Sequence, residues 1–445
     1  MHSKIKIHIP SMFAMFVILY LFWALWKEFR FSESLYNAGV LCFFVYIAAT
    51  MFKKECPVYM GQAIFYMSAW CVFMFMAYNN SIYSTFRRTV NFLGILMDSH
   101  ARVVLYLFLV VVPGILLARC YKYTSGRLFK IIVALIIVTS LYYSVHAVIV
   151  FPDALRARRT AAYLGYETIL FGTPTYSIVY SFCLIAPWFL AKCSETRGKT
   201  KLFYFLMLAC ICAIVAISQF ATAFVALIIG VFVYWLYSGK SDKGYILRYI
   251  VVLGIILMFF ARRPLAELFD SLSMMVSGAW SGKLKDLADF IQGENISGSI
   301  STRLRLYNYS WQAFLQSPVL GKLSGIQTGN VGGHSTMLDI LAMTGFLGAV
   351  LLGGAVRASF KHMKAVAQNE KYIAVATASF VSYLFLVCTK NILSSLSVNY
   401  TYFALLPMLF VMKEPGENEE VTKVSEDDEQ LNEIKEEEEN ERDFI

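Results

Sequence analysis

The sequence predicts an all-α polytopic membrane protein with about 12 transmembrane helices. Of its 445 residues, 58% are hydrophobic and only 16% are charged, a composition unlike that of soluble proteins. Many stretches approach the roughly 20 apolar residues that one helix needs to cross a bilayer. Helices are favoured because open sheet edges and irregular backbone cannot face lipid.

The predicted spans follow from the apolar stretches in chain order. They are residues 11–26, 36–52, 60–78, 102–118, 129–150, 174–191, 202–217, 221–237, 246–261, 338–356, 372–389 and 395–412. Lys and Arg are about twice as frequent in the short segments on the N-terminal side as on the other side. Since positive loops stay in the cytoplasm, both termini are predicted to be cytoplasmic. The first span carries no small-residue cleavage site after it, which favours an uncleaved anchor.

The acidic residues divide the chain into two regions. Residues 413–445 hold 15 of the 30 acidic residues, whereas residues 1–412 have an excess of Lys and Arg. A segment this charged cannot bury a core, so residues 413–445 are predicted to be a disordered acidic cytoplasmic tail. Residues 1–412 form the predicted transmembrane domain, and residues 262–337 are its large extracytoplasmic loop between spans 9 and 10.

One predicted outer segment, residues 151–173, contains arginines that the orienting charge bias does not explain. These are Arg156, Arg158 and Arg159. An anionic ligand on this face would account for the cluster, and so would ordinary solvated loop charge. The sequence leaves both interpretations open.

The large loop ends in a predicted helix at residues 302–316. Ser301 is its predicted N-cap and Pro318 its stop. Helical spacing places five apolar residues on one packing stripe. They are Leu304, Tyr307, Trp311, Phe314 and Leu315.

Two arginines flank this stripe differently. Arg303 lies at the edge of the stripe in the first turn, so it is expected to sit where the helix packs. Arg305 points to the opposite side and is expected to be solvated. Arg303 and the free N–H groups of a helix N-terminus together suit a phosphate; the alternative is a simple surface charge.

A glycine-rich turn brings His334 to the mouth of the next predicted span. Gly329, Gly332 and Gly333 allow the backbone to approach a ligand closely. An imidazole is suited to accept a proton near neutral pH, although a histidine here could also simply hydrogen-bond backbone at a span end. Asp339 lies five residues later, which is not a metal-ligand spacing on a helix; a buried hydrogen-bonding role is expected, and no metal site is predicted.

These residues fall in two stretches, "STRLRLYNYSWQAFLQSPVLGKLSG" and "HSTMLDILAMTGFLGAVLL". Together they resemble the signature of the O-antigen ligase/polymerase superfamily, roughly S-G-R-x-x-x-W, P-x-x-G-x-G, H-N-x-x-L and G-x-x-G. Arg303 matches the family arginine, His334 the histidine, and Gly345 and Gly348 the final glycines. An earlier stretch, "GTPTYSIVYSFCLIAPWFL", is similar to the family's G-N-P-N segment.

The chain departs from the family pattern at several positions. Tyr307 replaces the usual tryptophan and Ser335 the asparagine after the histidine, and Lys322-Leu323 interrupts the G-x-G. Many members carry S-R where this chain has Ser218-Gln219. If the family arginine binds diphosphate, the cluster at 156–159 would have to compensate for Gln219.

The resemblance implies a GT-C-like glycosyltransferase in a bacterial inner (cytoplasmic) membrane. It implies a metal-independent polymerase of undecaprenyl-diphosphate-linked repeat units, acting on the extracytoplasmic face without any cofactor or nucleic acid. His334 and Arg303 would be catalytic, and Gly332, Gly333, Asp339 and Tyr307 would support the site. The predicted diphosphate-binding set is Arg156, Arg158, Arg159, Gln219 and Arg305.

Two alternatives remain from the sequence. A ligase would transfer the finished polymer to lipid A core or to protein, and a flippase would only transport the lipid-linked glycan. Nearly charge-free span interiors, without an internal repeat, argue against transport. A chain-length regulator and a flippase are candidate protein partners.

Overall fold

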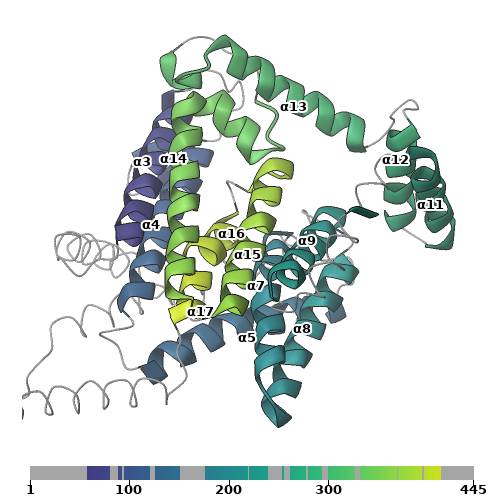
Figure 1. Ribbon diagram of the computed structural model, residues 1–445. Helices are drawn as coiled ribbons and strands as arrows, with labels where there is room; N and C mark the ends of the chain where they lie inside the picture. Colours follow the sequence, from purple (N-terminus) through teal and green to yellow (C-terminus); the bar gives the residue numbers. More distant parts are fainter. Residues whose placement is uncertain are drawn as a thin grey trace, which may run out of the picture.

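The computed structural model of the chain is a bundle of α-helices (Figure 1). It describes residues 58–80, 89–92, 95–120, 126–150, 176–218, 220–238, 253–254, 261–276, 279–292, 299–325, 331–367, 369–392 and 395–411. The predicted spans at 11–26 and 36–52 and the predicted tail at 413–445 lie outside these residues. So does the predicted span at 246–261, except for positions 253, 254 and 261.

The helices of the bundle coincide with the predicted spans to within a few residues, except that one is longer. They are α3 (Val58–Asn80), α4 (Ser99–Cys120), α5 (Gly126–Val150), α7 (Tyr176–Glu195), α8 (Gly198–Ser218), α9 (Ala221–Tyr237), α14 (Thr336–Val366), α15 (Glu370–Thr389) and the C-terminal run of α16 (Leu396–Tyr400), the π-helical turn η4 (Thr401–Leu405) and α17 (Leu406–Val411). The longer helix is α14, which extends ten residues past its predicted end.

A β-hairpin is the one departure from the predicted all-α fold among the described residues. Strands β1 (Thr89–Phe92) and β2 (Ile95–Asp98) pair antiparallel directly before α4. Strands of four residues carry too short a pattern to be recognised from periodicity.

Within the described ranges, five helical segments are long and apolar enough to cross a membrane. They are Gly61–Tyr78, Ser177–Glu195, Gly198–Ser218, Thr336–Val366 and Glu370–Thr389. Helix α8 leaves Leu202, Phe205 and Leu206 exposed although they are apolar, as expected of a helix that faces lipid. The chain is therefore a helical membrane protein.

Small and hydroxylated residues bring α7, α9 and α15 close together. Ser379 on α15 donates to the carbonyl of Leu184 on α7 at 2.8 Å, and Ser382 donates to the carbonyl of Ala226 on α9 at 3.1 Å. A Cβ atom at Gly230 would lie 2.9 Å from the hydroxyl of Ser382. Close approach through such residues is the usual way in which membrane helices associate.

Helix α14 is broken at Gly345, where φ is 64° and ψ is −159°. The break frees the N–H groups of Phe346 and Leu347, which donate to the carbonyls of Pro318 and Val319 at 2.8 and 3.3 Å. A Cβ atom at Gly345 would overlap the Val319 carbonyl. The glycine therefore lets the chain after α13 dock into the break.

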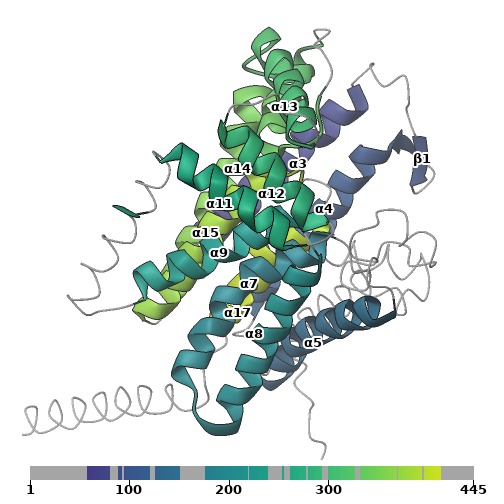
Figure 2. The ribbon, with the colours of Figure 1, turned by 90° about the vertical axis from the view of Figure 1, so that its right-hand side faces the viewer.

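Among the residues described between α9 and α14, the structure has three helices and a 3-10 turn. They are α11 (Arg262–Met275), α12 (Ala279–Gln292), α13 (Ser299–Gln316) and η3 (Gly321–Ser324). Figure 1 shows α13 lying across one end of the bundle, with α11 and α12 packed together beside it, and Figure 2 shows α13 at the same end from the side. The predicted large loop is therefore helical in its described part.

Hydrogen bonds identify which helix termini share each end of the bundle. At the α13 end, the Thr336 N–H at the start of α14 donates to the Lys390 carbonyl just after α15. At the opposite end, the Tyr372 hydroxyl near the start of α15 donates to Glu195 at the end of α7. We call these the α13 end and the α7–α15 end.

Candidate functional site

The candidate site lies at the α13 end, where α13 meets the turn 331–335 and the helix termini around it. Helix α13 contains the predicted helix 302–316 but begins at Ser299, so Ser301 is inside the helix and is not its N-cap. The helix stops before Pro318, as predicted. Arg303 is half-buried and Arg305 is exposed, which confirms the expected difference between them.

The packed face of α13 differs from the predicted apolar stripe. Leu304, Trp311 and Leu315 are exposed, and only Phe314 and, in part, Tyr307 are covered. Ser310 and Ala313 are buried in their place. Ser310 is 1% exposed and Ala313 is 0% exposed. Apolar periodicity missed this face because its centre is made of small residues that let neighbouring backbone approach.

A buried hydrogen-bond network joins α13 to the start of α14. The Ser310 hydroxyl donates to Oδ1 of Asp339 at 2.7 Å and accepts from the N–H of Gly332 at 2.9 Å. The same Asp339 oxygen accepts from the N–H of Gly333 at 3.1 Å. The two glycine N–H groups directly before His334 are thus held by one Ser–Asp pair.

The two glycines of this turn have different roles. A Cβ atom at Gly332 would overlap the Leu306 carbonyl group, with the carbonyl carbon only 2.6 Å away. Gly332 is therefore required by close approach to α13. Gly333 has open space around its Cβ position but a φ of 72°, a left-handed conformation that favours glycine.

The residues after His334 are fixed by α15. Ser335 caps α14 by accepting from the Leu338 N–H, and its hydroxyl also donates to the Cys388 carbonyl at 2.7 Å. The Thr336 hydroxyl donates to the Lys390 carbonyl at 2.8 Å. His334 is itself half-buried and lies between two segments whose backbones are both anchored.

Tyr307 links α13 to the end of α15 and lies close to charge. Its hydroxyl donates to the Thr389 carbonyl at 3.1 Å. Burial raises the pKa of the Tyr307 phenol above 10.0, while the positive charge of Arg303 lowers it and the carboxylate of Asp339 raises it. Arg303 and Asp339 therefore act electrostatically on the same phenol, which stays protonated and keeps its hydrogen bond at neutral pH.

Asp339 is buried as expected, at 2% exposure. Its Oδ1 atom accepts the two hydrogen bonds described above, whereas its Oδ2 atom has no hydrogen-bond partner among the described residues. A buried carboxylate oxygen without a partner is costly. An incoming hydroxyl or a water molecule would remove that cost.

Two lysines at this end were not part of the predicted site. Lys390 is half-buried and directly follows Thr389, whose carbonyl Tyr307 binds. Lys322 in η3 is also half-buried, and burial lowers its pKa below 10.5. The sequence did not point to Lys390 because a single cation after a predicted span carries no pattern, whereas the hydrogen bond from Tyr307 to Thr389 relates it to α13.

The structure brings together one part of the predicted site and leaves another part untested. Arg303, Tyr307, His334, Asp339 and the turn glycines belong to connected elements at the α13 end, and Arg305 lies on the exposed face of α13. The remaining members lie outside the described residues: Arg156, Arg158, Arg159 and Gln219.

Comparison with models of known protein families and with curated proteins finds no match for this chain. The chemistry of the α13 end is thus the basis for any assignment. It combines a half-buried histidine between anchored backbone segments, a half-buried arginine, a half-buried lysine and a buried carboxylate. Such a set can accept a proton and stabilise an anion at the end of a helical bundle.

Proposed function

We propose that the chain is a membrane glycosyltransferase that polymerises undecaprenyl-diphosphate-linked oligosaccharide repeat units into surface polysaccharide. The reaction would take place on the extracytoplasmic face of a bacterial inner membrane. The observation that carries the proposal is the junction at the α13 end. Residues matching the arginine and the histidine of the superfamily signature lie there on elements joined by the Ser310–Asp339 bond.

The proposed reaction is a displacement at an anomeric carbon. The oxygen of an acceptor hydroxyl attacks this carbon, the bond from the carbon to the phosphate oxygen breaks, and undecaprenyl diphosphate leaves. His334 takes the hydroxyl proton, a role that typically contributes about 10²–10⁴-fold to the rate. Arg303 stabilises the charge that develops on the departing diphosphate through charge-assisted hydrogen bonds.

Additional positive charge would stabilise a diphosphate further. The sequence analysis assigned this role to Arg156, Arg158 and Arg159, with Gln219 at the position of a family arginine. Lys390 is a further candidate because it directly follows Thr389, whose carbonyl accepts the hydrogen bond from Tyr307. The positive charge of Arg303 in turn lowers the pKa of Tyr307, so Tyr307 relates Lys390 to Arg303. We therefore add Lys390 to the proposed diphosphate-binding set.

The ligase alternative uses the same chemistry with a different acceptor. A ligase would transfer finished polymer to lipid A core or to protein, and the residues of the α13 end would serve it equally well. An assay of the purified protein with each acceptor separates these two activities. Polymer on lipid diphosphate would support the polymerase, and polymer on lipid A core the ligase.

One observation favours the transport alternative, namely the break in α14 at Gly345, because transporters bind substrates at broken helices. However, the N–H groups freed by this break are occupied by the carbonyls of Pro318 and Val319, so they are not open to a substrate. Turnover of lipid-linked substrate in detergent, where no second compartment exists, would distinguish an enzyme from a transporter.

The decisive test replaces the two proposed catalytic residues one at a time. His334→Ala and Arg303→Ala should each abolish polymer formation while membrane insertion and thermal stability remain close to wild type. Lys285→Ala, an exposed position on α12, is the matched control and should leave polymer formation unchanged. Full-length polymer from either active-site variant would refute the assignment.

A further inference from the structure

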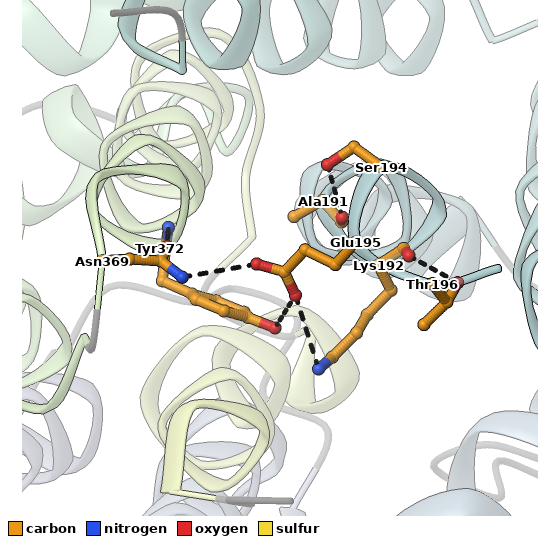
Figure 3. Close-up of polar contacts among 7 residues, drawn as sticks. All are labelled: Ala191, Lys192, Ser194, Glu195, Thr196, Asn369 and Tyr372. Carbon is orange, nitrogen blue, oxygen red and sulfur yellow. Dashed lines mark hydrogen bonds and ion pairs between the residues drawn. The ribbon is translucent and has the colours of Figure 1, made fainter.

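The α7–α15 end of the bundle carries a polar cluster that joins the end of α7 to the start of α15 (Figure 3). Glu195 on α7 accepts from the Tyr372 hydroxyl at 2.8 Å and from the Asn369 amide at 3.4 Å. Lys192 pairs with the same carboxylate at 3.7 Å and lies over the Tyr372 ring at 5.3 Å. Glu195, the one carboxylate on α7 at this end, is therefore already bonded to neighbouring side chains.

The end of the described chain reaches the same place. Phe410 in α17 packs edge-on against the Tyr372 ring, with 5.9 Å between ring centroids. The described part of α17 ends one residue later, at Val411. The described chain therefore ends beside the cluster of Glu195 and Tyr372, two residues before the acidic segment 413–445 begins in the sequence.

Around this cluster the surface is strongly basic. We define the basic rim as Arg197, Lys199, Lys201, Lys361, Lys364 and Lys371. These cations follow α7, begin α8, end α14 and begin α15, and no described carboxylate forms an ion pair with any of them. Lys361 and Lys364 lie over the rings of Tyr59 and Phe360 instead. Besides Glu195, only Glu370 adds an acidic charge to the described helix termini here.

The acidic segment that follows in the sequence has the opposite charge. Residues 413–445 contain 15 acidic and four basic residues, which gives a net charge of −11, and they include the run Glu436–Glu439. A random-coil chain of 33 residues would have a root-mean-square span of roughly 30 Å, enough for the acidic part of such a chain to reach the rim from Val411. Tethering of this kind typically gives an effective concentration in the millimolar range.

We propose that the acidic C-terminal segment 413–445 docks on the basic rim of its own chain. Docking would neutralise like charges that lie close together on four helix termini, and it would shield the rim from the phosphate groups of anionic lipids. The interaction is electrostatic and exposed, so it should weaken as salt shortens the Debye length from about 10 Å at 0.1 M to about 3 Å at 1 M. It does not depend on the proposed enzymatic activity.

The test measures energy transfer in the full-length protein between dyes placed at Thr200 and Ser425. In nanodiscs of neutral phosphatidylcholine, a high-transfer population should be present at low salt and lost at 1 M salt. Lys199→Glu/Lys201→Glu should lose this population at low salt, and so should the change of Glu436–Glu439 to glutamine. Arg263→Glu/Lys285→Glu, the same charge change on α11 and α12, is the matched control and should retain it.

Two results would overturn the proposal. One is equal energy transfer in the wild type, in the rim variant and in the variant of the acidic run. The distance between Thr200 and Ser425 would then not depend on the charges of the rim and the segment. The other is loss of the high-transfer population when phosphatidylglycerol replaces part of the neutral lipid, because anionic headgroups would then be the occupant of the rim. Normal gel-filtration behaviour of each variant shows that the comparison is made on folded protein.

Discussion

The hydroxyl of Ser310, in the middle of α13, donates a 2.7 Å hydrogen bond to the buried carboxylate of Asp339, in the first turn of α14. Each partner also accepts a backbone N–H group, from Gly332 and Gly333 respectively. The position of His334 therefore depends on two buried side chains that do not have to contact a substrate. This dependence leads to predictions that separate positioning from catalysis.

Replacing Ser310 with alanine should both destabilise the protein and impair the site. The change leaves the Gly332 N–H and one bond of Asp339 unsatisfied in a buried place, which costs about 1–3 kcal/mol. Thermal unfolding in detergent should show the loss of stability, and polymer formation should fall further than that loss explains.

Ser317→Ala provides the control for Ser310→Ala. Ser317 is also buried, one residue past the end of α13, but its hydroxyl donates to Ser324 at 3.0 Å, away from the turn 331–335. It should lower the unfolding temperature without a selective effect on activity. Equal loss of activity in both variants would show that the Ser310 bond holds the fold and not the histidine.

The adjacent turn glycines make a second matched pair. Gly332→Ala places a methyl group against the Leu306 carbonyl, so the turn must move and polymer formation should be lost. Gly333→Ala meets no atom within 4 Å and adds only the strain of a left-handed backbone, roughly 1–2 kcal/mol. Gly333→Asn should cost less than Gly333→Ala, because asparagine tolerates this conformation better. Full activity in Gly332→Ala would contradict the close packing of the turn on α13.

The sequence predicted the helical class, the bounds of most described helices to within a few residues and the helix that carries Arg303, because these follow from apolar patterns. It did not predict which face of α13 packs. The pattern favoured large apolar residues such as Trp311, whereas the structure buries Ser310 and Ala313. The role of Ser310 depends on Asp339, a partner 29 positions away. Interactions of this kind have no local pattern.

The final glycine pair shows the same limit. The motif pointed to Gly345 and Gly348, and the structure supplies their reasons. Gly345 breaks α14 so that Pro318 can dock, and a Cβ atom at Gly348 would overlap the Thr344 side chain. The sequence motif indicated that glycines are needed at positions 345 and 348, but it did not indicate which neighbouring groups require them.

Lys390 tests whether the proposed diphosphate site extends to α15. Lys390→Met should raise KM for the lipid-linked donor by roughly tenfold, corresponding to the loss of one charge-assisted hydrogen bond. The variant keeps the bonds from Thr336, which go to the Lys390 carbonyl and not to its side chain, and its thermal unfolding checks that the fold is retained. Lys390→Arg should restore most of the affinity because it keeps the charge.

Lys371→Met, at the opposite end of α15, is the control for Lys390→Met and should leave KM unchanged. If KM were also unchanged in Lys390→Met, Lys390 would not belong to the proposed site.

Gly345 and Gly353 together test whether the break in α14 is required. Gly345→Ala forces a side chain into a backbone conformation open almost only to glycine, at a cost of about 1–3 kcal/mol, and against the Val319 carbonyl. It should therefore lower the unfolding temperature and detach the chain after α13, which limited proteolysis near Pro318 would detect. Gly353→Ala, in open space within the same helix, should be neutral or stabilise by up to about 1 kcal/mol. If Gly345→Ala also unfolded at the wild-type temperature, α14 could straighten without loss of stability. The docking of Pro318 would then not be the cause of the break in α14.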